Sequence, residues 1–309
     1  MPQTLTAEVA ASALSWVTRP LPARADDVAR MMLRDGVAVM LAGAGHPAVR
    51  IYAALAREEG ARARAPVYRH GFGTSPAAAA MINGTATHAL DYEPMFDPPT
   101  HVVSPVLAAL LALSHAEVEP CGRRFLAAFA AGVQLQADLR RSAAAADSRA
   151  ADGHHHFPFQ AQGFHPPGPV GALGSALACS MLLGLDAARA AAALGIAASR
   201  AAGISGNIGT MVKSTHCGHA ARVGLESALA ARLGMSASTC TLAGPAGWGE
   251  VFGGSEFDHQ ALRGGMETLR AFDDPGFAVK RWPAHTAMQP TIAAALSLHD
   301  PARPPRAIR

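Results

Sequence analysis

Apolar side chains recur every three or four residues along most of the chain, and Gly and Pro interrupt this pattern at intervals. Such spacing is typical of amphipathic helices separated by turns. The predicted helices cover roughly residues 25–42, 47–60, 75–90, 103–117, 121–140, 168–184, 187–203 and 216–233. Because the alternating pattern of strands is nearly absent from this span, the sequence predicts an all-α fold.

The ends of these segments carry signals that agree with the periodicity. Ser75 precedes Pro76, which places a hydroxyl at the helix cap and proline at the first helical position. Gly184 and Gly234 stand where helices often end in a left-handed residue. Alanine, the strongest helix former, is also the most frequent residue, so composition favours helices as well.

The amino-acid composition of the chain changes near residue 273. A Pro-rich stretch, DDPGFAVKRWPAH, is followed by one apolar segment, TIAAALSL, and by a tail of prolines and arginines. We therefore predict two parts: an all-helical domain over residues 1–272, and over residues 273–309 the beginning of a second domain whose remainder is absent. A frayed terminus is the alternative interpretation of the tail.

Charge and cysteine content exclude several classes of protein. The 26 basic and 23 acidic residues are scattered rather than gathered in a stripe, so the sequence indicates no nucleic-acid partner. Apolar runs are too often interrupted for a membrane helix, and the N-terminus does not resemble a signal peptide. The four cysteines lie far apart without a C-x-x-C pair, which argues against an iron–sulfur or thiolate zinc site and favours a cytoplasmic location.

Two loop-and-helix segments bring polar residues together. In residues 83–101, NGTATHALDYEPMFDPPTH, a helix ends near Asp91 and a Pro-rich loop follows with Asp97 and His101. These residues could face one ligand, or Asp could cap a turn beside a surface His. In residues 163–176, GFHPPGPVGALGSA, His165 precedes a glycine-spaced helix whose N-terminus suits a carboxylate, although such glycines also serve helix packing.

Two further segments contain the only lysines of the chain. In GNIGTMVKSTHCGHAAR, Lys213 could anchor a carboxylate as a point charge, and the following His216 and His219 are more typical of packing than of metal binding. In FAVKRWPAH, Lys280 is followed by Arg281 and His285, which could equally form a solvated basic turn. The HHH run at 154–156 is interpreted as a loop, with metal binding as the alternative.

Taken in this order, AAAMINGTATHALDYE with its following His, GFHPPGPVGALGSA, GTMVKSTHCGHAAR and VKRWPAH resemble the MmgE/PrpD family over residues 10–295. This family includes 2-methylcitrate dehydratase, cis-aconitate decarboxylase and iminodisuccinate epimerase. The resemblance implies a large helical domain with a smaller α/β lid, a homodimer, and a site between the two domains. It also implies catalysis without metal or organic cofactor.

The resemblance further implies which residues form the site. The implied catalytic residues are Asp91, His101, His165, Lys213 and His285, and the implied substrate-binding residues are Lys213, Lys280 and Arg281. The family's substrates are small di- and tricarboxylates. We expect His101 and His165 to be the acid–base pair, Asp91 to orient an imidazole or a substrate hydroxyl, and His285 to close the site from the lid side.

The function implied is that of a lyase or isomerase that moves a proton next to a carboxylate, by dehydration, decarboxylation or epimerisation. Two departures weigh against full activity. Pro94 and Met95 stand where members commonly have an acidic or hydroxyl-bearing residue, and most of the lid is missing. The WPAH form of the last segment is closer to the decarboxylase and epimerase branches. The alternative is a non-catalytic helical protein that binds carboxylates or only dimerises.

Overall fold

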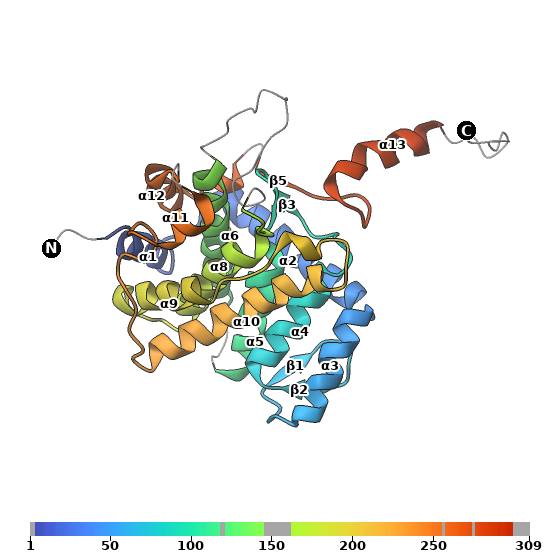
Figure 1. Cartoon of the computed structure of the whole chain (residues 1–309), viewed down its shortest axis with the longest axis horizontal. Helices are drawn as coiled ribbons and strands as arrows, with labels where there is room; N and C mark the ends of the chain where they lie inside the picture. The colour runs from blue at the N-terminus through green and yellow to red at the C-terminus, as the bar shows by residue number, and fades with distance from the viewer. Residues whose placement is uncertain (1–3, 118–120, 145–161, 255–256, 274–275, 299–309) are drawn as a thin grey trace.

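The computed structural model describes residues 4–117, 121–144, 162–254, 257–273 and 276–298, and it is built almost entirely of helices (Figure 1). The larger helices are α1 (Leu5–Ser15), α2 (Ala23–Gly43), α3 (Pro47–Glu59), α4 (Pro76–His88), α5 (Val103–Ala116), α6 (Gly122–Ala144), α8 (Pro167–Leu182), α9 (Ala187–Arg200), α10 (Val212–Arg232), α12 (His259–Thr268) and α13 (Gln289–Leu298). Shorter helical pieces are η1 (Ser205–Asn207), α11 (Trp248–Gly253), η2 (Arg270–Phe272) and η3 (Thr286–Met288). The all-α prediction is confirmed.

All the helices predicted from periodicity are present, with ends that differ by a few residues. The predicted signals act as expected: the Ser75 hydroxyl accepts a hydrogen bond from the Ala78 amide at 3.3 Å, and Gly184 and Gly234 adopt positive φ. Helix α1 was not predicted, although Thr4 caps it in the same way as Ser75 caps α4.

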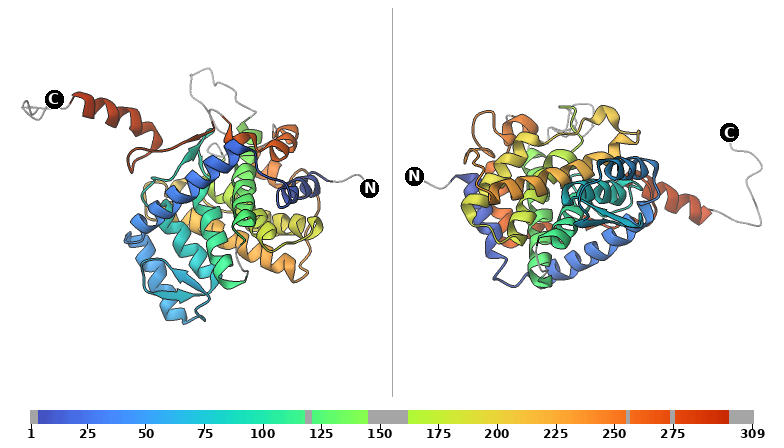
Figure 2. Two further views of the ribbon diagram at one scale, coloured as in Figure 1. Left: turned by 180° about the vertical axis from the view of Figure 1, so that it is seen from behind. Right: turned by 90° about the horizontal axis from the view of Figure 1, so that it is seen from below.

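The centre of the molecule is α8, in which every residue is buried. It packs against α10, α6, α9 and α5, and α10 also crosses α4 (Figure 2). The composition of α8 explains this position, because PGPVGALGSALACSML is small or apolar on all sides and leaves no polar face for water. The ends of α4, α8 and α10 therefore meet around one buried region.

Helices α4 and α10 touch backbone to backbone through two glycines. A Cβ on Gly218 would lie 2.2 Å from the Met81 carbonyl oxygen, and one on Gly84 would lie 2.9 Å from the Gly218 Cα. We expect Gly218→Ala to destabilise the protein by about 1–3 kcal/mol, because the helices must separate to admit a methyl group. Denaturant unfolding measures this loss, with Gly264→Ala, which has open space around it, as the control. An unchanged midpoint for Gly218→Ala would contradict the tight crossing.

Very short strands complete the fold and escape prediction from alternation. Strands β1 (Ala65–Val67) and β2 (Phe72–Thr74) form a hairpin. Strand β3 (Met95–Phe96) lies between β4 (Thr100–His101) and β5 (Phe277–Ala278), both antiparallel to it. The β3–β5 pair ties the segment after residue 273 to the helical body. Beyond it, α13 projects from the body and has no buried residue (Figure 1).

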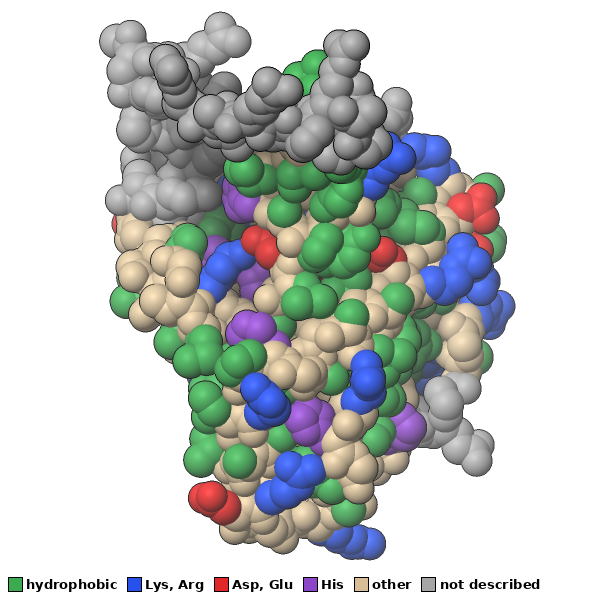
Figure 3. All heavy atoms as spheres, turned by 90° about the vertical axis from the view of Figure 1, so that its right-hand side faces the viewer, with side chains coloured by type: hydrophobic (Ala, Val, Ile, Leu, Met, Phe, Trp, Pro, Cys, Tyr) green, Lys and Arg blue, Asp and Glu red, His purple; other side chains and the backbone are tan. Residues whose placement is uncertain are grey.

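One face of the molecule shows how its charged side chains are distributed. On the face shown in Figure 3, hydrophobic side chains lie between basic ones that are spread over the surface, with fewer acidic ones. Among the described residues, no single helix combines the length and apolarity needed to cross a bilayer. Only α2 and α3 taken together are long and apolar enough, by length and composition, and an 80° bend separates them.

Candidate active site

Five residues from distant parts of the chain line one pocket of about 370 Å³. They are Asp91, His101, His165, Lys213 and His285. Asp91 follows α4, His101 ends β4, His165 precedes α8, Lys213 lies in the first turn of α10, and His285 precedes η3. The structure therefore brings together all the residues that the sequence analysis named as catalytic.

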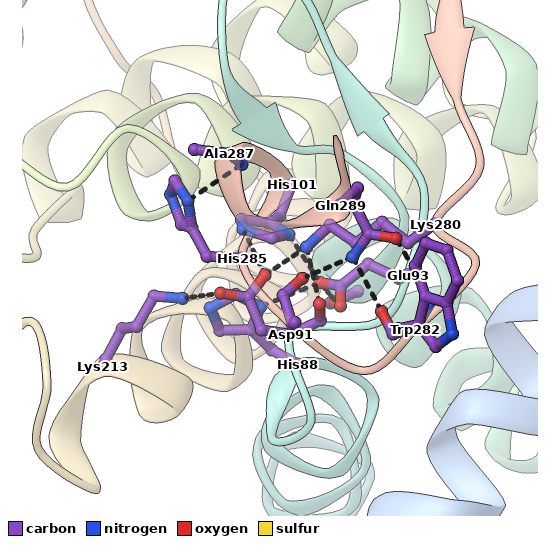
Figure 4. A network of polar contacts seen from close by, with 12 residues as sticks. His88, Asp91, Glu93, His101, Lys213, Lys280, Trp282, His285, Ala287 and Gln289 are labelled. Atoms are coloured by element: carbon purple, nitrogen blue, oxygen red, sulfur yellow. Dashed lines mark hydrogen bonds and ion pairs between the residues drawn. The ribbon is translucent and has the colours of Figure 1, made fainter. Parts of the chain in front are cut away.

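Asp91 is the charge centre of this pocket (Figure 4). Its Oδ2 lies 2.7 Å from Lys213 Nζ, and its Oδ1 pairs with Lys280 Nζ, which also donates to the Asp91 carbonyl oxygen at 2.6 Å. His101 Nε2 lies 3.4 Å from the same Oδ1. Burial opposes ionisation of Asp91, but the nearby His101 and Lys213 outweigh it and hold the pKa of this carboxyl below its usual range. Asp91 is therefore a carboxylate at neutral pH.

A second carboxylate, Glu93, lies behind His101 and is fully buried. Its Oε1 accepts a hydrogen bond from Ser104 Oγ and lies 2.9 Å from His88 Nδ1 and 3.2 Å from His101 Nδ1. Burial works against the charge, but His88 and His101 prevail and keep the pKa of Glu93 well below its ordinary value. His101 thus has a carboxylate near each ring nitrogen.

Burial also controls two other imidazoles of the site. Burial lowers the pKa of His88 to about 4, although Glu93 partly compensates, and lowers the pKa of His165 to about 2, with help from His88 and His101. His165 Nδ1 lies 3.0 Å from His216 Nδ1. Both His88 and His165 are therefore neutral at pH 7, a state in which an imidazole can both give and accept a proton.

Lys280, Arg281 and His285, all from the segment FAVKRWPAH, differ in their positions relative to the pocket. The Lys280 side chain is only 1% exposed and is directed to Asp91, and Arg281 stacks over the Trp282 ring at 5.4 Å. Neither lines the pocket with His285. His285 is exposed, and its Nδ1 accepts from the Ala287 amide at 3.2 Å. The substrate-binding roles of Lys280 and Arg281 remain predictions.

The turn that carries His285 is held in place by Gln289. This side chain accepts from the Arg281 and Trp282 amides at 3.0 and 3.1 Å, and donates to the Trp282 carbonyl at 3.0 Å. Tyr92, next to Asp91, donates its hydroxyl to the Arg281 carbonyl at 3.0 Å. Through these bonds the position of His285 depends on the loop that carries Asp91.

His88, Glu93 and Ser104 were not among the residues predicted for the site, and His216 was predicted only to pack or to bind a metal. The available signal was the presence of His and Glu in an otherwise apolar segment around Asp91. Asp97, in contrast, is exposed and does not line the pocket. Met95 does line it, so an apolar wall stands at that position. The HHH run at 154–156 lies outside the described residues.

One group in the described part of the chain could hold a metal ion. His88, Glu93 and Cys217 offer ligand atoms that lie within 4.8 Å of one another. However, His88 and Ser104 already bond Glu93, and burial raises the pKa of the Cys217 thiol well above its ordinary value. Glu93 is thus engaged in hydrogen bonds within the protein, and we assign no metal ligand to the group.

Taken together, the fold and the pocket define a helical protein in which histidines, a carboxylate and a lysine line one pocket. The chain matches the model of the MmgE/PrpD N-terminal domain over residues 7–260, and it belongs to this family. It is 34% identical to human cis-aconitate decarboxylase over 228 residues and 33% identical to the mouse protein over 226 residues. These matches cover 72% and 71% of this chain but only 44% and 43% of the relatives, so the chain spans less than half their length. It is also 31% identical to a cis-aconitate decarboxylase-like protein of Aspergillus oryzae, over 73% of this chain and 47% of that protein.

Proposed function

We propose that the chain carries the acid–base site of a lyase that decarboxylates a small unsaturated tricarboxylate of the cis-aconitate type, without metal or organic cofactor. The observation that carries the proposal is the convergence of Asp91, His101, His165, Lys213 and His285 on one pocket. The names of the similar relatives give the substrate class. Dehydration and epimerisation use the same kind of proton transfer and remain outcomes of the test.

The residues divide the chemistry between charge and proton transfer. Lys213 lines the pocket and stabilises substrate carboxylates and the negative charge that develops as CO₂ leaves. The C–CO₂ bond breaks, its electron pair shifts through the neighbouring double bond, and a histidine delivers a proton to the far carbon. His101 and His165 are the proton-transfer residues, because both line the pocket and a well-placed histidine contributes about 10²–10⁴-fold to such a step.

Proton NMR in deuterated water tests this proposal. The chain is incubated with cis-aconitate, 2-methylcitrate, citrate and an iminodisuccinate-type diacid, with His101→Asn as the inactive control. Release of CO₂ and one deuterium in the product from cis-aconitate, absent in the control, is the expected result. If only another of the substrates reacts, the reaction of that substrate takes the place of decarboxylation in the proposal. If none of the four substrates reacts, the proposal that this chain carries a competent site is refuted.

A second candidate function is carboxylate binding without turnover. The exposure of His285 and the lack of any buried residue in α13 favour it, because a site open to water is a poor place to stabilise charge. Binding of cis-aconitate in calorimetry without reaction in the NMR experiment would establish this second function in place of the first.

Lys213 and Lys280 are expected to contribute differently to binding. Lys213→Ala should weaken cis-aconitate binding by about tenfold, because it removes a cation that lines the pocket. Lys280→Ala should weaken it less, since the Lys280 ammonium is directed to Asp91 and its side chain is only 1% exposed. Isothermal calorimetry at low salt compares the two variants. Equal losses would contradict the assignment of Lys213 as the anchor.

We also propose that the protein is a cytoplasmic homodimer. The family resemblance supports the dimer, and exposed apolar side chains such as Ile51 and Leu55 on α3 provide surface for association. Free cysteines at all four positions fit a reducing compartment. Sedimentation equilibrium at micromolar concentration is expected to give twice the chain mass of 31.7 kDa. The chain mass itself would contradict the dimer.

A further inference from the structure

The buried imidazoles of His165 and His216 contact each other, and the proton transfer proposed above does not involve His216. Their Nδ1 atoms are 3.0 Å apart, and the residues are 5% and 8% exposed. The His165 amide donates to the Gly203 carbonyl at 3.0 Å, and the Gly168 amide donates to the His165 carbonyl at 3.1 Å. The backbone of Gly203 also lies against the His216 ring, where an added Cβ would be 3.2 Å from Cγ. Both rings are therefore held in place.

A hydrogen bond between two Nδ1 atoms places a condition on the protons of both rings. Exactly one of the two atoms carries a hydrogen when both rings are neutral, so one ring donates and the other accepts. Burial favours this neutral state, since it lowers the pKa of His216 to about 4 and that of His165 to about 2. If His216 donates, the proton of His165 must be on Nε2. If His165 donates, its Nε2 has a free lone pair.

The two histidines differ in their access to the pocket. His165 lines it, whereas His216 does not and reaches the substrate only through His165. The other titratable groups near the pair are His88 and His101 on the side of His165, and Lys213 and His219 on the helix of His216. An imidazole in this second position can control the tautomer of the first without touching the substrate.

We propose that His216 is a positioning residue that sets which ring nitrogen of His165 carries the proton and that donates to the opposite nitrogen while this proton is transferred. The catalytic part of this inference rests on the proposed function. Loss of CO₂ from a carboxylate consumes one proton per turnover. As His165 Nε2 gives its proton to the substrate carbon, His165 Nδ1 takes the Nδ1 proton of His216, and His216 Nε2 takes one from water, whose hydroxide combines with the released CO₂ as bicarbonate. Both rings stay neutral, but each is left in its other tautomer. After the product leaves, His165 Nε2 takes a proton from water that enters the pocket, His165 Nδ1 returns its proton to His216 Nδ1, and His216 Nε2 gives one back to water.

Nitrogen-15 NMR of histidine-labelled protein tests the tautomer without any substrate. Three variants differ in what they offer to His165 Nδ1: His216→Asn has an amide that can donate or accept, His216→Asp has acceptor oxygens, and His216→Phe has neither. The signals of His165 are assigned from their loss in His165→Asn. His219→Asn, one turn further along α10, is the matched control and is expected to leave the His165 signals unchanged.

We expect His165 to hold its proton on Nδ1 in His216→Asp, whereas the amide of His216→Asn can pair with either tautomer. We also expect kcat to fall by about 10- to 100-fold in His216→Asn with an unchanged KM, because the amide can donate a hydrogen bond but cannot pass on a proton. His216→Phe should fall further. Identical His165 signals in all His216 variants would overturn the inference. If the His165 tautomer shifts in the variants but the wild type shows no turnover, the positioning role is supported and the proposed reaction is refuted.

Discussion

Replacement of Asp91 by asparagine is expected to reduce turnover by about 10²–10⁴-fold while leaving substrate binding as tight as before or tighter. Asp91 stands between the ammonium groups of Lys213 and Lys280 and beside His101. Loss of its negative charge leaves two lysines uncompensated, which favours an anionic ligand. The same loss removes the group that orients His101 and holds Lys213, so the reacting groups are no longer aligned.

Asparagine is chosen because it keeps the backbone of this position. Asp91 has a φ of 49°, a left-handed conformation that Asn tolerates and that most other residues do not. Asp27→Asn is the matched control, since Asp27 is exposed on α2 and does not line the pocket. The measurements are kcat, KM and the calorimetric affinity for cis-aconitate, with thermal unfolding as a check on the fold. A kcat within threefold of the wild type, or a large rise in KM alone, would contradict the assigned role.

The helices could be predicted from sequence because their signals are local. Caps such as Ser75 and the three-to-four spacing of apolar residues act within a few residues of each other. The strands β3, β4 and β5 have two residues each, too few to show an alternating pattern. The β3–β5 pair joins segments far apart in the chain, and no local signal marks such a contact.

The candidate site also combines residues that local motifs predict with contacts between distant segments that no motif predicts. The resemblance supplied Asp91, His101, His165, Lys213 and His285 because each stands in a recognisable motif. The contacts that give these residues their properties are tertiary. Lys280 reaches Asp91 across 189 positions, and His216 reaches His165 across 51. Such separations along the sequence explain why the contact of the Lys280 ammonium with Asp91 was not predicted, and the substrate-binding role of Lys280 stays a prediction.

Acidification is expected to destabilise the protein between pH 6 and 5 through its buried histidines. Burial lowers the pKa values of His88 and His216 to about 4 and that of His165 to about 2, whereas an unfolded histidine titrates near 6.5. In this range the unfolded chain binds protons that the folded protein excludes, so stability falls as pH falls. Each such group contributes about 1.4 kcal/mol per pH unit at most.

Asp138 has the opposite effect on the free energy of unfolding over the same pH range. Burial raises the pKa of this carboxyl to about 7, although a hydrogen bond from Gln134 partly offsets the rise. The folded protein therefore keeps a proton on Asp138 that the unfolded chain releases above pH 4, and this contribution is lost as pH rises toward 7. Three histidines against one carboxyl leave a net loss of about 2 kcal/mol for each pH unit between pH 6 and 5.

Urea unfolding at pH 8, 6 and 5 measures this dependence, and Asp138→Asn separates its two parts. The variant lacks the opposing carboxyl, so its stability should fall more steeply with acid, by about 1.4 kcal/mol more per pH unit. It should also be more stable than the wild type at pH 8, where the wild type must bury the ionised Asp138. A stability that does not change between pH 6 and 5 in both proteins would show that the three histidines become protonated in the folded protein, and it would refute their lowered pKa values.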